Sequence, residues 1–87
     1  MAAANIEFDQ DALTAPADTA FNIQFANQDQ GVPHDVDIRQ PGADTVADNP
    51  IIDGGETTYA VPALAAGEYE FFCSVHPQTM VGTLTVE

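Results

Sequence analysis

Alternation of apolar and polar side chains, residue by residue, is the feature that most restricts how this chain can fold. In one segment Phe21, Ile23 and Phe25 are separated by Asn22 and Gln24. Successive side chains of a β-strand point to opposite faces, so a period of two puts one face against a core and the other in water. Short strands of this kind predict an all-β protein with antiparallel pairing. The same pattern recurs in the segments 6–8, 35–39, 58–61, 68–71 and 83–86.

Turn residues separate these segments and indicate how they connect. Residues 40–56 show no clear pattern, and we expect them to cross from one sheet to the other, as a Greek key requires. Eighty-seven residues suffice for one small domain with a modest core. We therefore predict a single domain over residues 1–87 with a Greek-key β-sandwich fold. The glycines, prolines and aspartates typical of tight turns occur at Asp29-Gln30-Gly31, Pro41-Gly42, Asp53-Gly54-Gly55 and Ala66-Gly67.

The phase of the strands predicts where the chemically distinctive side chains point. Cys73 follows Phe71 by two residues, so its side chain should share the same inward face. His34 is likewise in phase with Val36 and should also point into the core. Phe72 precedes Cys73 directly, and we expect it on the opposite face, exposed to solvent.

Side chains that bind soft metals cluster near the C-terminus. Cys73, His76 and Met80 are spaced C-x2-H-x3-M, and the chain has one cysteine and only one other histidine, His34. Two histidines and a cysteine in a trigonal plane, with a long bond to methionine, form the ligand set of electron-transfer copper sites. Thiolate and thioether favour Cu(I), while imidazole suits both oxidation states. The sequence therefore indicates one copper ion bound by these four residues.

Other interpretations of the same residues are weaker. His34 alone could be a buried core histidine, Met80 a core filler and Cys73 an inert buried thiol. Zinc could occupy the same ligands, which we interpret as mis-metallation rather than function. A thiol enzyme built on Cys73 and His76 would have its nucleophile in phase with the core and no evident oxyanion hole. We therefore expect a protein that is not an enzyme and has no small-molecule substrate.

The charge balance restricts the partners. Fourteen acidic residues accompany one arginine and no lysine, which gives a formal net charge of −13. Because the chain lacks basic residues to neutralise phosphates, nucleic-acid binding is excluded. The negative field favours a basic protein partner, and solubility or adaptation to salty water explains it equally well. Acids that could steer such a partner are Asp44, Asp48, Asp53 and Glu56.

Two segments of the chain resemble a known family. Gly31-Val32-Pro33-His34-Asp35-Val36 and Gly67-Glu68-Tyr69-Glu70-Phe71-Phe72-Cys73-Ser74-Val75-His76-Pro77, with Met80 and the closing strand 81–86, are similar to cupredoxins. These are the type 1 blue copper proteins of the plastocyanin, pseudoazurin and amicyanin group, and the likeness covers most of the chain from about Phe21 onward. The resemblance implies that His34, Cys73 and His76 are equatorial copper ligands, the histidines through their δ nitrogens, and that Met80 is the axial ligand.

The resemblance also implies a function and a location. It implies electron transfer between a redox protein donor and acceptor, with copper cycling between +1 and +2, in a monomer. We expect a periplasmic or other extracytoplasmic protein, with a leader or membrane anchor encoded upstream. A partly exposed His76 would lie in a small apolar patch that suits brief docking. The alternatives are a copper carrier or store and the cupredoxin module of a larger oxidase. The residues of the expected patch are Val32, Pro33, Val75 and Pro77.

The chain departs from the family in two places. The spacing from His76 to Met80 lies between the shorter amicyanin loop and the longer plastocyanin loop, so it leaves the copper–methionine distance, the colour and the potential open. Asp35 stands where the family tends to have asparagine. Its carboxylate could accept a hydrogen bond from Ser74 or from a backbone N–H, and its negative charge would favour Cu(II).

Overall fold

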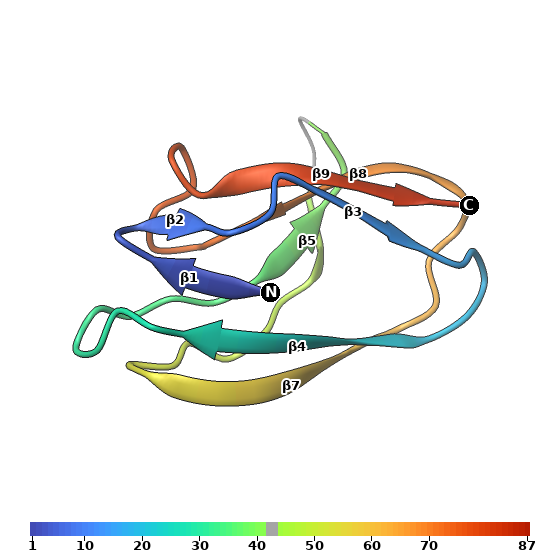
Figure 1. Ribbon diagram of the computed structural model, residues 1–87. Helices are drawn as coiled ribbons and strands as arrows, with labels where there is room; N and C mark the ends of the chain where they lie inside the picture. Colours follow the sequence, from blue (N-terminus) through green and yellow to red (C-terminus); the bar gives the residue numbers. More distant parts are fainter. Residues whose placement is uncertain (42–43) are drawn as a thin grey trace.

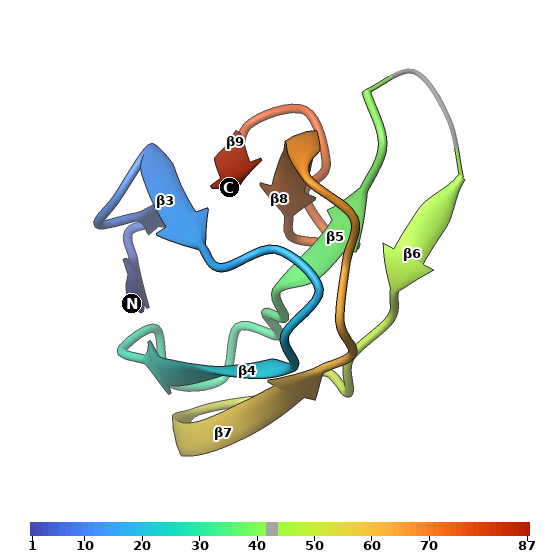
Figure 2. The ribbon, with the colours of Figure 1, turned by 90° about the vertical axis from the view of Figure 1, so that its right-hand side faces the viewer.

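Two β-sheets packed face to face make up the computed structural model, which describes residues 1–41 and 44–87 (Figures 1 and 2). The first sheet has the strand order β2-β1-β4-β7 and the second the order β3-β9-β8-β5-β6. This two-layer arrangement confirms the predicted all-β sandwich. The strands are β1 (Ala2–Ala4), β2 (Glu7–Phe8), β3 (Ala12–Ala15), β4 (Phe21–Asn27), β5 (Asp37–Arg39), β6 (Thr45–Ala47), β7 (Gly55–Val61), β8 (Gly67–Phe72) and β9 (Val81–Val86).

The long strands follow the alternation in the sequence. β4 pairs antiparallel with β7, from Phe21 opposite Val61 to Asn27 opposite Gly55. β8 pairs antiparallel with β9 and with β5. The apolar set of each of these strands faces the other sheet, because only that face removes apolar surface from water. The inward residues with the least exposure include Phe25, Tyr59, Phe71 and Leu84.

The first fifteen residues supply strands to both sheets, and two of these strands pair in parallel. β1 lies parallel to β4 in the first sheet, and β3 lies parallel to β9 in the second. The expectation of purely antiparallel pairing is therefore wrong at these two places. β1 consists of alanines and β3 is half alanine, so neither has an apolar–polar alternation that would predict a strand. Each is added beside a strand whose own pattern is strong.

The segment 6–8 is less of a strand than its sequence predicts. Only Glu7 and Phe8 belong to β2, and Ile6 is 42% exposed. Asn5 and Ile6 instead form the two-residue tip of the β1–β2 hairpin, with φ of 55° and 58°. Positive φ at both central positions is the geometry of the hairpin turn whose twist matches its strands. The requirement of the turn therefore overrides the apolar character of Ile6.

Four aromatic rings connect the two sheets through the core. Phe71 of β8 lies 5.5 Å from Phe8 of β2, measured between ring centroids. Phe8 is 6.3 Å from Phe25 of β4, which in turn is 5.8 Å from Tyr59 of β7. Tilted, edge-on and offset pairs at such distances add about 0.5–1.5 kcal/mol each beyond the burial of their area. The chain of rings thus fixes the spacing of the layers that carry the site.

The patternless segment 40–56 crosses between the sheets, as the sequence predicts. It contains β6, which pairs with β5 in the second sheet, and it continues into β7 in the first. Ile52, within the crossing, forms an isolated antiparallel bridge with His34. The predicted Pro41-Gly42 turn extends beyond the described residues. The crossing thus pairs with the chain at His34, just before β5.

The predicted exposure of Phe72 is wrong. Its side chain points away from the core, yet the residue is only 7% exposed. Arg39 on the neighbouring β5 lies over the ring, with its guanidinium carbon 4.3 Å from the ring centroid. The Nε–H of Arg39 donates to Glu70 at 2.9 Å, which holds the guanidinium in place. The single basic side chain of the protein therefore covers Phe72 through a cation–π contact.

The polar side chains at the start of β5 are covered, which the alternation of the sequence does not reveal. Asp35, two residues before the strand, and Asp37, its first residue, are 1% and 2% exposed. The segment after β6 folds over them, and the Asn49 N–H donates to an oxygen of Asp37 at 2.7 Å. The Asn49 amide nitrogen also donates to the Val36 carbonyl at 2.7 Å. Hydrogen bonds of this kind allow the carboxyl groups to be buried.

Candidate metal centre

The loops that follow β4 and β8 lie at the same end of the sandwich (Figure 1). They bring His34, Cys73 and His76 together. His34 lies just before β5, where its backbone N–H and C=O pair with those of Ile52 at 3.0 and 2.9 Å. Cys73 directly follows β8, and His76 lies in the loop that leads to β9. The strand phase predicts that His34 and Cys73 point inward, and both are 0% exposed.

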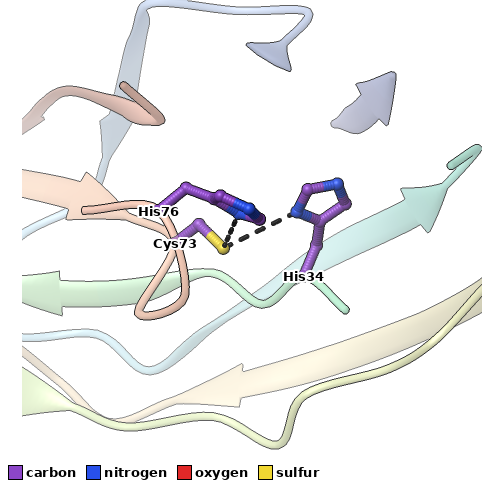
Figure 3. Close-up of side chains that lie close together, drawn as sticks. All are labelled: His34, Cys73 and His76. Atoms are coloured by element: carbon purple, nitrogen blue, oxygen red, sulfur yellow. Dashed lines mark hydrogen bonds between the residues drawn. The ribbon is translucent and has the colours of Figure 1, made fainter. Parts of the chain in front are cut away.

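The two histidines present the same type of nitrogen to the cysteine sulfur (Figure 3). Nδ1 of His34 lies 3.7 Å and Nδ1 of His76 lies 3.8 Å from Sγ of Cys73. Bonds of about 2.0 and 2.3 Å to nitrogen and sulfur, meeting at about 120°, place two donor atoms about 3.7 Å apart. Both nitrogens therefore stand at the separation from the sulfur that one trigonally coordinated ion requires.

The loop from Cys73 to Met80 is closed by backbone hydrogen bonds. The Cys73 N–H donates to the Met80 carbonyl at 3.0 Å, and the Met80 N–H donates to the His76 carbonyl at 2.9 Å. The His76 N–H also donates to the Cys73 carbonyl at 3.1 Å. Met80 is 1% exposed and packs within the core cluster. Its backbone is thus fixed beside Cys73 and His76, and its role as axial ligand stays a prediction.

The surroundings of His76 are more open than those of the other two residues. His76 is half-buried, whereas His34 and Cys73 are buried. Val75 is 40% exposed and Pro77 is exposed on either side of it. Two further residues of the expected apolar patch, Val32 and Pro33, are half-buried.

Comparison with known proteins shows to which family the chain belongs. The family model for the cupredoxin-like domain matches residues 1–86. The chain belongs to the cupredoxin-like domain family. This match confirms the resemblance that the two sequence motifs carry. A search of curated proteins gives no significant match in sequence.

Solved structures of blue copper proteins have the same fold as this cupredoxin. Auracyanin A, a blue copper protein from Chloroflexus aurantiacus, is 24% identical with a TM-score of 0.80, covering 93% of this chain and 89% of that chain. Auracyanin from Roseiflexus castenholzii is 20% identical with a TM-score of 0.76, covering 91% and 86%. Amicyanin from Paracoccus versutus is 23% identical with a TM-score of 0.71, covering 99% and 77%.

The donor set of this cupredoxin fits a single type 1 copper ion. One ligand atom each from His34, Cys73 and His76 lies within 4.8 Å of the others, and the chemistry is imidazole plus thiolate.

No helix in residues 1–41 and 44–87 has the length and apolar character needed to cross a membrane.

Asp35 joins the two loops that carry the candidate ligands. One of its oxygens accepts a hydrogen bond from the Ser74 N–H at 2.7 Å, and the other accepts from the Ser74 hydroxyl at 2.6 Å. The hydrogen bonds expected for Asp35 are therefore confirmed. Since Asp35 follows His34 and Ser74 follows Cys73, the carboxylate fixes the two loops relative to each other.

Asp37 is the carboxyl group whose pKa departs most from its usual range. Burial raises the pKa of Asp37 to about 7, against the effect of the hydrogen bond from Asn49. The negative charges of Asp35 and Asp48 raise this pKa further. Oxygen atoms of the three carboxylates lie within 4.8 Å of one another. Protonation of Asp37 therefore relieves repulsion within this cupredoxin close to its candidate copper site.

Asp29 is the site residue that the sequence does not single out. Its Oδ2 lies 2.9 Å from Nε2 of His34, on the side of the ring away from Cys73. Hydrogen bonds from the N–H of Ile6, from His34 and from the N–H of Asn5 lower the pKa of Asp29. Histidines that bind metals commonly donate the N–H of their second ring nitrogen to a carboxylate, so an acidic partner for His34 is expected. Among fourteen acids, no pattern in the sequence distinguishes this one.

Proposed function

We propose that this cupredoxin transfers single electrons between redox proteins through one copper ion held by His34, Cys73, His76 and Met80. The observation that carries the proposal is the approach of two Nδ1 atoms to one cysteine sulfur at 3.7 and 3.8 Å. Copper bound there would supply a one-electron couple between +1 and +2. We further propose that the protein is a single domain over residues 1–87 and that it acts as a monomer outside the cytoplasm.

The rigidity of the ligand loops favours electron transfer over metal carriage. Backbone hydrogen bonds close the loop from Cys73 to Met80, and Asp35 fixes it to the loop of His34. Ligands that keep their places in both oxidation states need little rearrangement when an electron moves. A copper carrier must release its metal, so it suits an exposed, incomplete site. The full burial of His34 and Cys73 is opposite to that requirement.

The surface around His76 suits a short-lived contact with a basic partner. Val75 and Pro77 supply exposed apolar atoms next to the one candidate ligand that solvent reaches. Electron-transfer contacts are small and weak, so a patch of this size suffices. The net charge of −13 would steer a basic donor or acceptor toward the protein. Exposed acids available for this steering include Asp44, Asp48, Asp53 and Glu56.

Copper titration of the apo-protein tests the proposal. We expect one equivalent of Cu(II) to give intense visible absorption and the electron paramagnetic resonance spectrum of a type 1 site. Cys73→Ser should abolish both, because the thiolate–copper transition needs the sulfur, and Thr79→Ser in the same loop is the control. Fast electron self-exchange separates transfer from carriage. A colourless copper complex of the parent protein, or an unaltered spectrum in Cys73→Ser, would overturn the proposal.

A further inference from the structure

The face of His34 turned away from Cys73 is held by a carboxylate. Nε2 of His34 lies 2.9 Å from Oδ2 of Asp29, and Nδ1 lies 3.7 Å from Sγ of Cys73. A carboxylate can only accept a hydrogen bond, so the hydrogen of the neutral imidazole sits on Nε2. The lone pair of Nδ1 is then free on the side of Cys73 and His76. Asp29 thus selects the tautomer that can bind a metal through the δ nitrogen.

The same carboxylate holds the tip of the β1–β2 hairpin. Oδ1 of Asp29 accepts a hydrogen bond from the Asn5 N–H at 2.7 Å, and Oδ2 accepts one from the Ile6 N–H at 2.9 Å. Ile6 has φ of 58°, a conformation that a β-branched residue adopts only at a cost in free energy. Glycine is the usual second residue of such a turn. The two hydrogen bonds to Asp29 offset the cost of placing isoleucine there.

Asp29 is itself fixed by the loop that leads to His34. Its N–H donates to the side-chain oxygen of Asn27 at 2.9 Å, and the amide nitrogen of Asn27 donates to the carbonyls of Val32 and Ile52 at 2.9 Å. The Val32 N–H closes the turn by donating to the Asp29 carbonyl at 3.0 Å. Asn27 is 3% exposed, so this framework is shielded from competing water. The carboxylate is therefore presented to His34 from a rigid support.

We infer that Asp29 is a positioning residue whose carboxylate sets the tautomer and orientation of His34 and couples the β1–β2 hairpin to the copper site. This inference rests on the proposed copper function and deepens it. An anionic partner makes the imidazole a stronger donor to the metal and favours Cu(II). Asp29 also connects the site to the hairpin, which lies far from His76 and Met80 in sequence, so that a change in the hairpin affects the site. Figure 1 shows the hairpin tip at the same end of the sandwich as the two ligand loops.

The first experiment measures the copper protein. Asp29→Asn replaces one carboxylate oxygen with an NH₂ group, which cannot accept a hydrogen bond from the N–H groups of Asn5, Ile6 or His34. It also removes the negative charge. We expect it to shift the equilibrium about tenfold toward Cu(I), a rise of about 59 mV in reduction potential for one electron. Glu7→Gln, an exposed residue of the same hairpin, removes an equal charge without touching His34 and should leave the potential close to that of the parent. Equal potentials in the two variants would overturn the inference.

The second experiment uses the 87-residue apo-protein and needs no copper. At mildly alkaline pH, nitrogen–proton correlation spectra should show His34 in the Nε2–H form, with a slowly exchanging proton that Asp29→Ala releases. The amide protons of Asn5 and Ile6 should exchange faster in the same variant. Asp29→Asn serves where Asp29→Ala does not fold. A parent protein with His34 in the Nδ1–H form, or unchanged exchange at Asn5 and Ile6, would overturn the inference.

The two experiments separate this inference from the proposed function. If the parent protein forms no type 1 copper spectrum while the apo-protein shows the expected tautomer, then the proposed function fails and the tie through Asp29 stands. If the parent protein loads normally while Asp29→Asn and Glu7→Gln have equal reduction potentials, then the function stands and the role of Asp29 is overturned.

Discussion

At the scale of single residues, the carboxylate of Asp35 is expected to influence the reduction potential. It is 1% exposed and accepts two hydrogen bonds from Ser74. Its negative charge favours Cu(II), so Asp35→Asn should raise the potential on the order of 50 mV, roughly a tenfold change in the redox equilibrium. Spectroelectrochemical titration checks this, with the exposed Asp44→Asn as control. A potential that stays at the parent value would contradict the prediction.

Asp37 should give the protein a pH dependence opposite to that of a salt-bridged carboxylate. Because burial raises its pKa from 3.8 to about 7, the native state keeps a proton that the unfolded chain loses at lower pH. The contribution of Asp37 to the free energy of unfolding is greatest below pH 3.8 and falls as pH rises to about 7. Asp37→Asn should remove this fall and add on the order of 1 kcal/mol at pH 8, a value discounted for screening by solvent.

Urea unfolding of the apo-protein at several pH values measures this effect. The informative quantity is the difference in free energy of unfolding between Asp37→Asn and the parent, because the other acids cancel in that difference. Asparagine keeps an oxygen for the N–H of Asn49, which limits structural disturbance. A difference that does not change between mildly acidic and mildly alkaline pH would show that Asp37 is ionised in the native state throughout.

At the scale of strands, Gly82 of β9 is required by the close approach of two other elements. It lies opposite Phe71 of β8. A Cβ atom at this position would lie 2.7 Å from the backbone oxygen of Asp11 and even closer to the ring of Phe71. We expect Gly82→Ala to destabilise the apo-protein by about 1–3 kcal/mol, as overpacking does. Thermal unfolding measures this, and the exposed Thr83→Ala on the same strand should change stability by less than about 0.5 kcal/mol.

The sequence predicts those strands whose two faces differ in polarity. In β4, β7, β8 and β9 the apolar set faces the opposite sheet, and the phase of β8 correctly points Cys73 inward. The pattern could not reveal β1 or β3, because alanine marks neither face. It also misplaced Phe72, because the residue that covers it, Arg39, lies on another strand. Coverage by a neighbouring strand depends on which strands pair, and alternation within one strand contains no such information.

The candidate ligands could be predicted because their chemistry is rare in this chain. One cysteine and two histidines leave few combinations, and the structure brings all three together. Asp29 could not be predicted, since its role depends on where a turn places a common side chain. The same is true of Asn27, whose amide links two loops that are distant in sequence. Rare residue types can be read from composition, whereas hydrogen-bond partners of ligands depend on tertiary structure.

At the scale of the whole molecule, the charged side chains are almost all negative. The single arginine is paired with Glu70 and lies over Phe72, so little positive charge offsets the fourteen acids. We expect the rate of electron transfer with a small basic cytochrome to fall about tenfold or more between 10 and 150 mM salt, as the screening length shrinks from roughly 30 to 8 Å. Stopped-flow kinetics measures this, with an uncharged small-molecule reductant as control. A rate insensitive to salt would show that the charge does not steer the partner.

The ligand end of the sandwich depends on the register in which two strands pair. Cys73 and His34 are 39 residues apart, and they meet because β8 and β5 are neighbours and because Ile52 holds the backbone of His34. A slip of two residues in the pairing of β5 with β8 would keep every inward side chain inward, yet it would move the sulfur and the imidazole apart by about 6.6 Å. Correct alignment of these two strands, and not inward orientation alone, therefore decides whether the candidate ligands meet.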